Sequence, residues 1–170
     1  MNEHLQKTAA ALVERFEGQE EEFRGDLSVT LAAEHIVDAC RMLREEFDFE
    51  ILSEETAVDY WPEEKPRFHV VYRIRSLQHN LILGMRVPLD GHAPVMPSIE
   101  PVYHNANWFE RELWDMFGIL FEGHPDLRRI VMPHDWEGHP LRKDYPLGYE
   151  EVQFSFNFKE INDRKPYAEE

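Results

Sequence analysis

Residues 105–146 read NANWFERELWDMFGILFEGHPDLRRIVMPHDWEGHPLRKDYP, and they carry the most distinctive chemistry of this 170-residue chain. The stretch holds three of the four tryptophans and three histidines, and the tripeptide Gly-His-Pro occurs in it twice. Its first part predicts a helix that ends at Gly118, because glycine readily adopts the left-handed conformation that follows a helix. At about 100° per residue, the apolar residues of this helix fall on one arc that faces the core. They are Phe109, Leu113, Met116 and Phe117.

The charged residues of this helix predict two local pairings. Asn107 and Glu110 form the Asn-x-x-Glu pattern of a capping box. Because Glu110 also falls on the apolar side, where a carboxylate needs a partner, an arginine of the following loop is the favoured alternative. Arg111 and Asp115 stand four residues apart on the opposite side, a spacing that favours an ion pair, and Glu112 lies near Asp115. Glu110 and Glu112 point about 200° apart, which excludes the acid–base pair of a glycosidase.

The two Gly-His-Pro tripeptides, at 123–125 and 138–140, predict rigid turns, since glycine permits positive φ and proline fixes its own φ. Each turn is followed by a pair of cations, and three tryptophans lie nearby in the sequence. Arginine and tryptophan concentrate binding energy at protein interfaces, so the stretch is interpreted as a protein-binding surface. Besides Trp108 and Trp114, the residues expected at subunit interfaces are Arg111, Glu112, Asp115, His124, Arg128, Arg129, Trp136, Arg142, Lys143 and Asp144, with Glu110 as a structural carboxylate.

Other chemistries fit the stretch less well. His124, His134 and His139 are candidate metal ligands of a free-standing enzyme, but their spacing matches no helical or Cys-x-x-Cys ligand pattern. Residues 124–126 form the His-Pro-Asp tripeptide of chaperone J-domains, although the basic two-helix frame of that domain is missing. No glycine-rich phosphate loop and no Ser/His/Asp or Cys/His arrangement is present in the sequence.

Upstream of the stretch, hydrophobic periodicity predicts one α+β domain over residues 1–149. Helices are expected at 5–16 and 32–47, and strands at 27–31, 50–61, 68–75 and 81–87. The last two strands form a hairpin across 78–80, with Arg73, Arg75 and Arg86 on its other face or its rim. This order predicts a mixed β-sheet with helices packed on one face, followed by a loop-rich C-terminal extension.

Two segments stand outside these elements. Residues 88–101 contain four prolines and are expected to be a connector without regular structure. Residues 150–170 are expected to be an extended tail, in which Val152, Phe154, Phe156 and Phe158 alternate with polar residues. Such a strand needs a cover for its phenylalanine face, and we expect that cover to be a partner subunit rather than the chain's own sheet.

Composition narrows the class of protein. The net charge is −16, and residues 1–65 hold eighteen acidic residues against six basic ones, so nucleic acid is a poor partner. The single cysteine, Cys40, cannot form an intramolecular disulfide or hold an iron–sulfur cluster, and its place in a helical stripe predicts a buried side chain. No apolar run is long enough to cross a bilayer and no targeting pattern begins the chain, so membrane association is expected only through partners.

The long gapped pattern of the central stretch resembles the 30 kDa subunit family of respiratory complex I, which includes the C subunit of the bacterial NADH–quinone oxidoreductase and the J subunit of the plastid complex. The residues that carry the resemblance are Glu110-Arg111-Glu112, Asp115-Met116-Phe117-Gly118, Phe121, Gly123-His124-Pro125, Leu127-Arg128-Arg129-Ile130, Trp136, Gly138, Pro140-Leu141-Arg142-Lys143-Asp144 and Pro146. The upstream order of elements is also similar to the N-terminal layer of that family.

The resemblance implies a cofactor-free structural subunit in the quinone module of a proton-translocating oxidoreductase. FMN and iron–sulfur clusters are then expected in other subunits, which pass electrons from NADH to quinone. The implied partners are the subunit that forms the quinone cavity and the subunit that holds the terminal iron–sulfur cluster. The implied location is peripheral, on the cytoplasmic side of the bacterial inner membrane. An equivalent subunit of a related membrane-bound hydrogenase or other-donor complex, and an independent acidic adaptor, stay open as alternatives.

Overall fold

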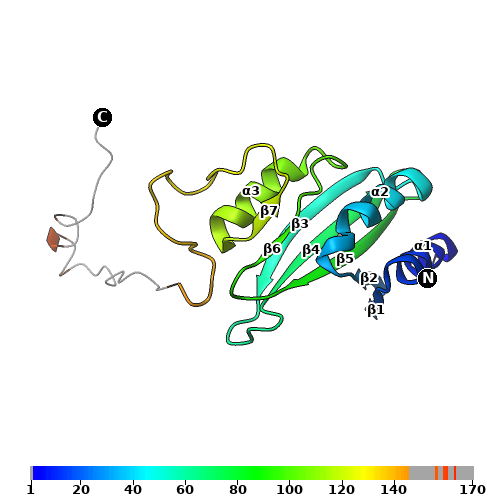
Figure 1. Ribbon diagram of the computed structural model, residues 1–170, viewed down its shortest axis with the longest axis horizontal. Coiled ribbons are helices and arrows are strands. Elements are labelled where there is room, and N and C mark those ends of the chain that lie inside the picture. The colour runs from blue at the N-terminus through cyan, green and yellow to red at the C-terminus, as the bar shows by residue number, and fades with distance from the viewer. Residues whose placement is uncertain (1, 146–155, 157–158, 161–162, 164–170) are drawn as a thin grey trace.

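A computed structural model describes residues 2–145, 156, 159, 160 and 163 (Figure 1). Its elements are α1 (Glu3–Phe16), β1 (Gln19–Phe23), β2 (Asp26–Thr30), the 3₁₀ turn η1 (Ala33–His35), α2 (Ile36–Glu46), β3 (Ile51–Asp59), β4 (Phe68–Ser76), β5 (Leu81–Leu89), β6 (Val95–Pro97), α3 (Ala106–Phe117) and β7 (Leu120–Glu122). The predicted tail at 150–170 lies almost wholly outside the described residues. In the described part of the chain, no helix combines the length and apolar character needed to span a bilayer.

The main sheet has the order β1-β2-β5-β4-β3, in which only the β2–β5 pair is parallel. Side chains alternate strictly along β4, so that Phe68, Val70, Tyr72 and Ile74 are buried on one face. The helices cover this face, and α3 lies beside the small sheet of β6 and β7 at one end of the molecule (Figure 1). The predicted α+β architecture, a mixed sheet with helices on one face, is confirmed.

The two N-terminal helices form because their apolar residues recur at helical spacing. In α1 the side chain of Asn2 caps the first turn by accepting from the backbone N–H of His4 at 2.9 Å. The buried residues of α2 include Cys40, which is fully buried as the sequence predicts. Burial, with Glu55 and Glu110 as neighbouring charges, raises the pKa of the Cys40 thiol, so it packs as a small apolar group.

Two strands were not predicted, and the expectation that residues 88–101 lack regular structure was wrong. The acidic run at 20–22 is part of β1, an edge strand that pairs with β2 across the turn at 24–25. Residues 88–101 also contain a strand, because β6 pairs in parallel with β7 and buries Met96. A three-residue strand has no periodicity of its own, and its partner lies after the next helix. The expected placement of Arg73, Arg75 and Arg86 on the other sheet face agrees with the registers of β4 and β5.

Candidate docking site

The helix α3 begins two residues earlier than the capping-box prediction requires. Asn105 is its N-cap and makes no side-chain cap, so the predicted box of Asn107 and Glu110 is wrong. The Glu110 carboxylate instead accepts from the Ser98 hydroxyl at 2.5 Å and from the Ile99 backbone N–H at 2.7 Å. The alternative of an arginine partner for Glu110 is also wrong. The hydrogen bonds to this carboxylate come from residues 98–99, before α3. The prediction had instead assigned it an arginine from the loop after α3.

Glu110 belongs to a buried acidic pair with Glu55 of β3. Glu110 is fully buried, and burial raises its pKa to about 7 even though Ser98 and Ile99 hydrogen-bond to the charged form. Glu55 is 5% exposed, and neither of its carboxylate oxygens has a hydrogen-bond partner among the described residues. Burial and the nearby Glu110 charge raise the pKa of Glu55 well above its usual value. Glu55 therefore holds its proton more tightly than an ordinary glutamate, because its ionised form would be an uncompensated buried charge.

This pair predicts that stability falls as pH rises from weakly acidic to neutral. An acid whose pKa is higher in the folded state binds more protons there, so the free energy of unfolding decreases between its unfolded and folded pKa values. For Glu110 that window runs from 4.5 to about 7, a loss of roughly 3 kcal/mol. We expect Glu110→Gln to flatten this part of the curve, as measured by urea unfolding at a series of pH values. The exposed Glu112→Gln on the same helix is the matched control, and a full wild-type slope in Glu110→Gln would contradict the assignment.

Asp115 fixes the loop that follows α3. Its carboxylate is fully buried and accepts three backbone N–H groups on Oδ2, from Ile130, Val131 and Met132 at 2.8–3.0 Å. Its Oδ1 accepts from the guanidinium of Arg129. Burial alone would raise the pKa of Asp115, but these four hydrogen bonds outweigh burial and hold the pKa below its usual value. A single carboxylate thus holds residues 129–132 against the helix.

The predicted ion pair between Arg111 and Asp115 is wrong, because Asp115 is already occupied by the loop. Arg111 donates instead to the carbonyl oxygens of Arg128 and Arg129 at 3.3 and 3.4 Å. Its guanidinium also lies over the ring of Trp108, 5.2 Å from the centroid. Arg129 donates to the carbonyl oxygens of Trp136 and Gly138 in addition to Asp115. Arg111 and Arg129 are therefore loop-fixing groups, and most of their donors are used inside the chain.

A second buried charge network fixes the next loop onto the sheet. Arg67, at the start of β4, makes two hydrogen bonds to Asp59 at 3.0 and 2.9 Å and two to Asp144 at 2.9 and 2.6 Å. Asp59 also accepts from the backbone N–H of Lys143 at 2.8 Å and of Trp61 at 3.0 Å. Burial alone would raise the pKa of Asp59, but the hydrogen bonds from Arg67, Lys143 and Trp61 outweigh burial and lower that pKa to about 2. Hydrogen bonding to Arg67 likewise lowers the pKa of Asp144, whose side chain is 36% exposed and is tied to the sheet by Arg67.

Both Gly-His-Pro turns have the expected backbone, with φ of 82° at Gly123 and at Gly138. The histidines of these turns pack against α3. His124 accepts from the backbone N–H of Asp126 at Nδ1, so its Nε2 carries the proton and donates to the carbonyl oxygen of Asn107. His139 is placed with Nδ1 3.0 Å from the Asp115 carbonyl oxygen. Over the described residues, the structure brings no three His, Cys, Asp or Glu side chains together as a metal site.

Only one cation of the pair that follows each Gly-His-Pro turn is exposed. Arg128 is exposed while Arg129 is nearly buried. Lys143 is exposed, and Arg142 is half-buried with Nη2 on the Gly91 carbonyl oxygen. We use the term docking surface for seven of the exposed side chains of this stretch, those of Trp108, Glu112, Arg128, Val131, Trp136, Leu141 and Lys143. Trp108 is 60% exposed and Val131 59%, so the docking surface includes uncovered apolar side chains as well as charged ones.

The sequence reasoning missed Arg67, Asp59, Glu55 and Ser98. The sequence contained a signal for the two acids of β3. Glu55, Ala57 and Asp59 alternate along the strand and share its buried face, and Leu52 is also buried. A register shift between Leu52 and Glu54 obscures the alternation. Acids at inward-facing positions of a strand indicate buried partners or neutral forms. No comparable signal marks Arg67, which directly precedes its strand, or Ser98, which lies in a proline-rich segment.

Comparison with known proteins supports one family. Residues 29–151 match the family described as respiratory-chain NADH dehydrogenase, 30 Kd subunit. The C subunit of the NADH-quinone oxidoreductase of Roseiflexus sp. (strain RS-1) is 49% identical over 168 residues, covering 98% of this chain and 95% of that protein. The corresponding protein of Geobacter sulfurreducens is 45% identical over 126 residues, covering 74% of this chain and 78% of that one.

Solved structures agree with this match. A trypsin-resistant fragment (1–134) of Nqo5 superposes with a TM-score of 0.65 at 30% identity, covering 73% of this chain and 99% of the fragment. A chain of the membrane-bound sulfane sulfur reductase, an archaeal respiratory membrane complex, superposes with a TM-score of 0.72 and covers 97% of this chain and 95% of that one. At 22% identity that second likeness concerns the fold alone. The chain belongs to the family of the 30 kDa subunit of respiratory-chain NADH dehydrogenase.

Proposed function

We propose that this chain is a structural subunit of an NADH-quinone oxidoreductase, that it holds no redox cofactor, and that its docking surface binds neighbouring subunits. The proposal rests on the structural roles of the charged residues that hold the loops within 105–145. Asp115 and Arg67 fix two loops rigidly, and the same loops present Trp136, Arg128 and Lys143 at the surface. Preorganised loops with exposed arginine and tryptophan are typical of protein interfaces. The relatives' names supply the enzyme: they are subunits of NADH-quinone oxidoreductase.

The proposed partners are the subunit that forms the quinone cavity and the subunit that holds the terminal iron–sulfur cluster. FMN and the clusters then reside in other chains, and this chain orders the module in which quinone is reduced. We place it as a peripheral subunit on the cytoplasmic side of a bacterial inner membrane. The family match and the names of the relatives support a place in such a complex.

Charge reversal on the docking surface tests the proposal. Arg128→Glu and Lys143→Glu should each weaken association with partner subunits about tenfold, because a like charge replaces a complementary one at the interface. Native electrophoresis of detergent extracts measures the amount of assembled complex. Arg24→Glu, in the exposed turn between β1 and β2 at the far end of the sheet, is the matched control. The isolated variants should keep the wild-type thermal midpoint, and undiminished assembly in both would contradict the proposal.

A further inference from the structure

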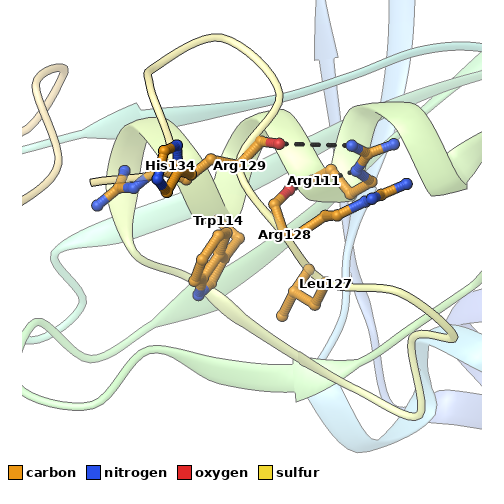
Figure 2. A pocket seen from close by; sticks show the side chains of 6 residues that line it. All are labelled: Arg111, Trp114, Leu127, Arg128, Arg129 and His134. Atoms are coloured by element: carbon orange, nitrogen blue, oxygen red, sulfur yellow. Dashed lines mark hydrogen bonds between the residues drawn. The ribbon is translucent and has the colours of Figure 1, made fainter. Parts of the chain in front are cut away.

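A basic pocket lies between α3 and the loop that Asp115 fixes. Its volume is about 420 Å³, and it is lined by Arg111, Trp114, Leu127, Arg128, Arg129 and His134 (Figure 2). Three of these six residues carry a guanidinium group and none carries a carboxylate. The chain as a whole has a net charge of −16, so this concentration of positive charge is a local exception. Such a contrast favours an anionic occupant.

The three arginines differ in how far the chain itself satisfies them. Arg129 uses Nη1 on the Asp115 carboxylate and carbonyl oxygens and Nη2 on the carbonyl oxygens of Trp136 and Gly138. Arg111 uses Nε and Nη2 on carbonyl oxygens, and within the described part of the chain no bond engages its Nη1. Arg128 has only an exposed pairing of Nε with Asp126, at 2.9 Å, which contributes little in water. In Figure 2 Arg111 and Arg128 project toward one side of the pocket, whereas Arg129 lies toward His134. Two guanidinium groups thus retain donors for a ligand.

The rest of the pocket is apolar, and its surroundings are apolar too. Trp114 and Leu127 are half-buried and provide its uncharged surface. Beyond the pocket, the loop exposes Ile130 and Val131, and Trp136 lies further along it. A free anion would leave these apolar side chains in water, whereas a polypeptide covers them and brings carboxylates to the arginines. The chemistry therefore favours an acidic peptide segment over a small anion.

We infer that this pocket receives a carboxylate-bearing segment of a partner polypeptide. An Asp or Glu side chain of that segment accepts hydrogen bonds from Arg111 and Arg128, and a neighbouring apolar side chain packs on Trp114 and Leu127. Because Arg111 is held in place by two loop carbonyl oxygens, its guanidinium is preorganised, and little conformational entropy is lost when the carboxylate binds. This inference rests on the proposed docking function and identifies the chemistry of one contact within it.

Site-specific photo-crosslinking in the assembled complex tests the inference. The crosslinker p-benzoylphenylalanine is placed at His134, which is exposed and lines the pocket, and in a second variant at Leu127. After irradiation of the detergent-purified complex, mass spectrometry identifies the attached segment. We expect a partner polypeptide with at least one Asp or Glu within about five residues of the crosslink, the reach of a short extended segment.

Each other outcome overturns the inference. A crosslink to residues 146–170 of this chain, to lipid, or to a partner segment without a carboxylate would contradict it. The absence of a crosslink at both positions, in a complex that contains the chain, would also contradict it. The proposed function fails separately, if the wild-type chain is missing from the complex.

A charge exchange provides the second readout. Arg128→Glu should lower assembly about tenfold, and reversal of the crosslinked acid to arginine should restore it to within about twofold of wild type. Failure of that rescue contradicts the contact.

Discussion

Replacing Arg67 with methionine is expected to lower the free energy of unfolding by about 3 kcal/mol. The Arg67 and Asp59 side chains are 3% and 2% exposed, so the methionine leaves the Asp59 carboxylate buried without its cation. It also removes both hydrogen bonds that hold Asp144 to the sheet. The loop at 142–145 is then held less firmly to the sheet, and docking through Lys143 should weaken with it. Urea unfolding measures the first effect and native electrophoresis the second.

The matched control for this variant is Arg73→Met in β4, the strand that Arg67 precedes. Arg73 lies on the other face of the sheet, is 42% exposed, and has only a 3.9 Å pairing with the exposed Asp26. Exposed pairs contribute little, so we expect a change below about 1 kcal/mol. An Arg67→Met variant that unfolds at the same urea concentration as Arg73→Met would show that the buried network does not stabilise the fold.

Replacing Asp115 with alanine is expected to release the loop after α3 from the helix. The variant leaves three backbone N–H groups without their acceptor and the Arg129 guanidinium without its carboxylate. Hydrogen bonds to a charged group contribute about 1.5–3 kcal/mol each. Hydrogen exchange at Ile130, Val131 and Met132 should therefore accelerate on the order of 10- to 100-fold, as measured by exchange and mass spectrometry.

Asp126→Ala serves as the control for the loop variant. Asp126 lies in the same loop, but its carboxylate pairs with Arg128 at the exposed surface. Protection of the three amides should stay at its wild-type level in this variant. If Asp115→Ala kept that protection as well, the loop would be held by contacts other than this carboxylate, and the docking surface would not depend on it.

Much of the fold follows from sequence because it depends on local periodicity. The alternation along residues 68–75 predicts β4 and its buried face, and the helical stripe around Cys40 predicts α2. The edge strand β1 was missed because its acidic residues have no apolar face, being exposed throughout. The strand β6 was missed because its parallel partner β7 follows only after α3. Local pattern contains no information about such distant pairing.

The sequence identified the family motif but misassigned its charge pairs. The motif at 110–146 identifies the family from the sequence, and the Gly-His-Pro turns have the expected conformation. Its charge pairs were assigned by helical spacing, which favours a pair between Arg111 and Asp115. The folded loop supplies Asp115 with four donors at once, three of them backbone N–H groups, and Arg111 donates to carbonyl oxygens of the same loop instead. Local spacing also gives no information about the partner of Asp144, because Arg67 is 77 residues away in the chain.

The use of the charged residues also changes how the motif is understood. A dense set of His, Glu, Asp and Arg side chains is typical of an active site. Here Asp115, Arg129 and Asp144 are occupied by hydrogen bonds within the chain, and Glu110 is bound to Ser98 and Ile99. Their chemistry is structural in the described part of the molecule. The docking surface is what these networks hold in place.

The most direct test of the docking role is turnover per assembled complex in the Arg128→Glu variant. Native electrophoresis gives the number of complexes, and NADH-dependent quinone reduction in the same band gives the activity of each. If the chain acts by docking, the number of complexes falls about tenfold while turnover per complex stays at the wild-type value. A normal number of complexes with lost turnover would contradict the account, because Arg128 would then take part in the reaction itself.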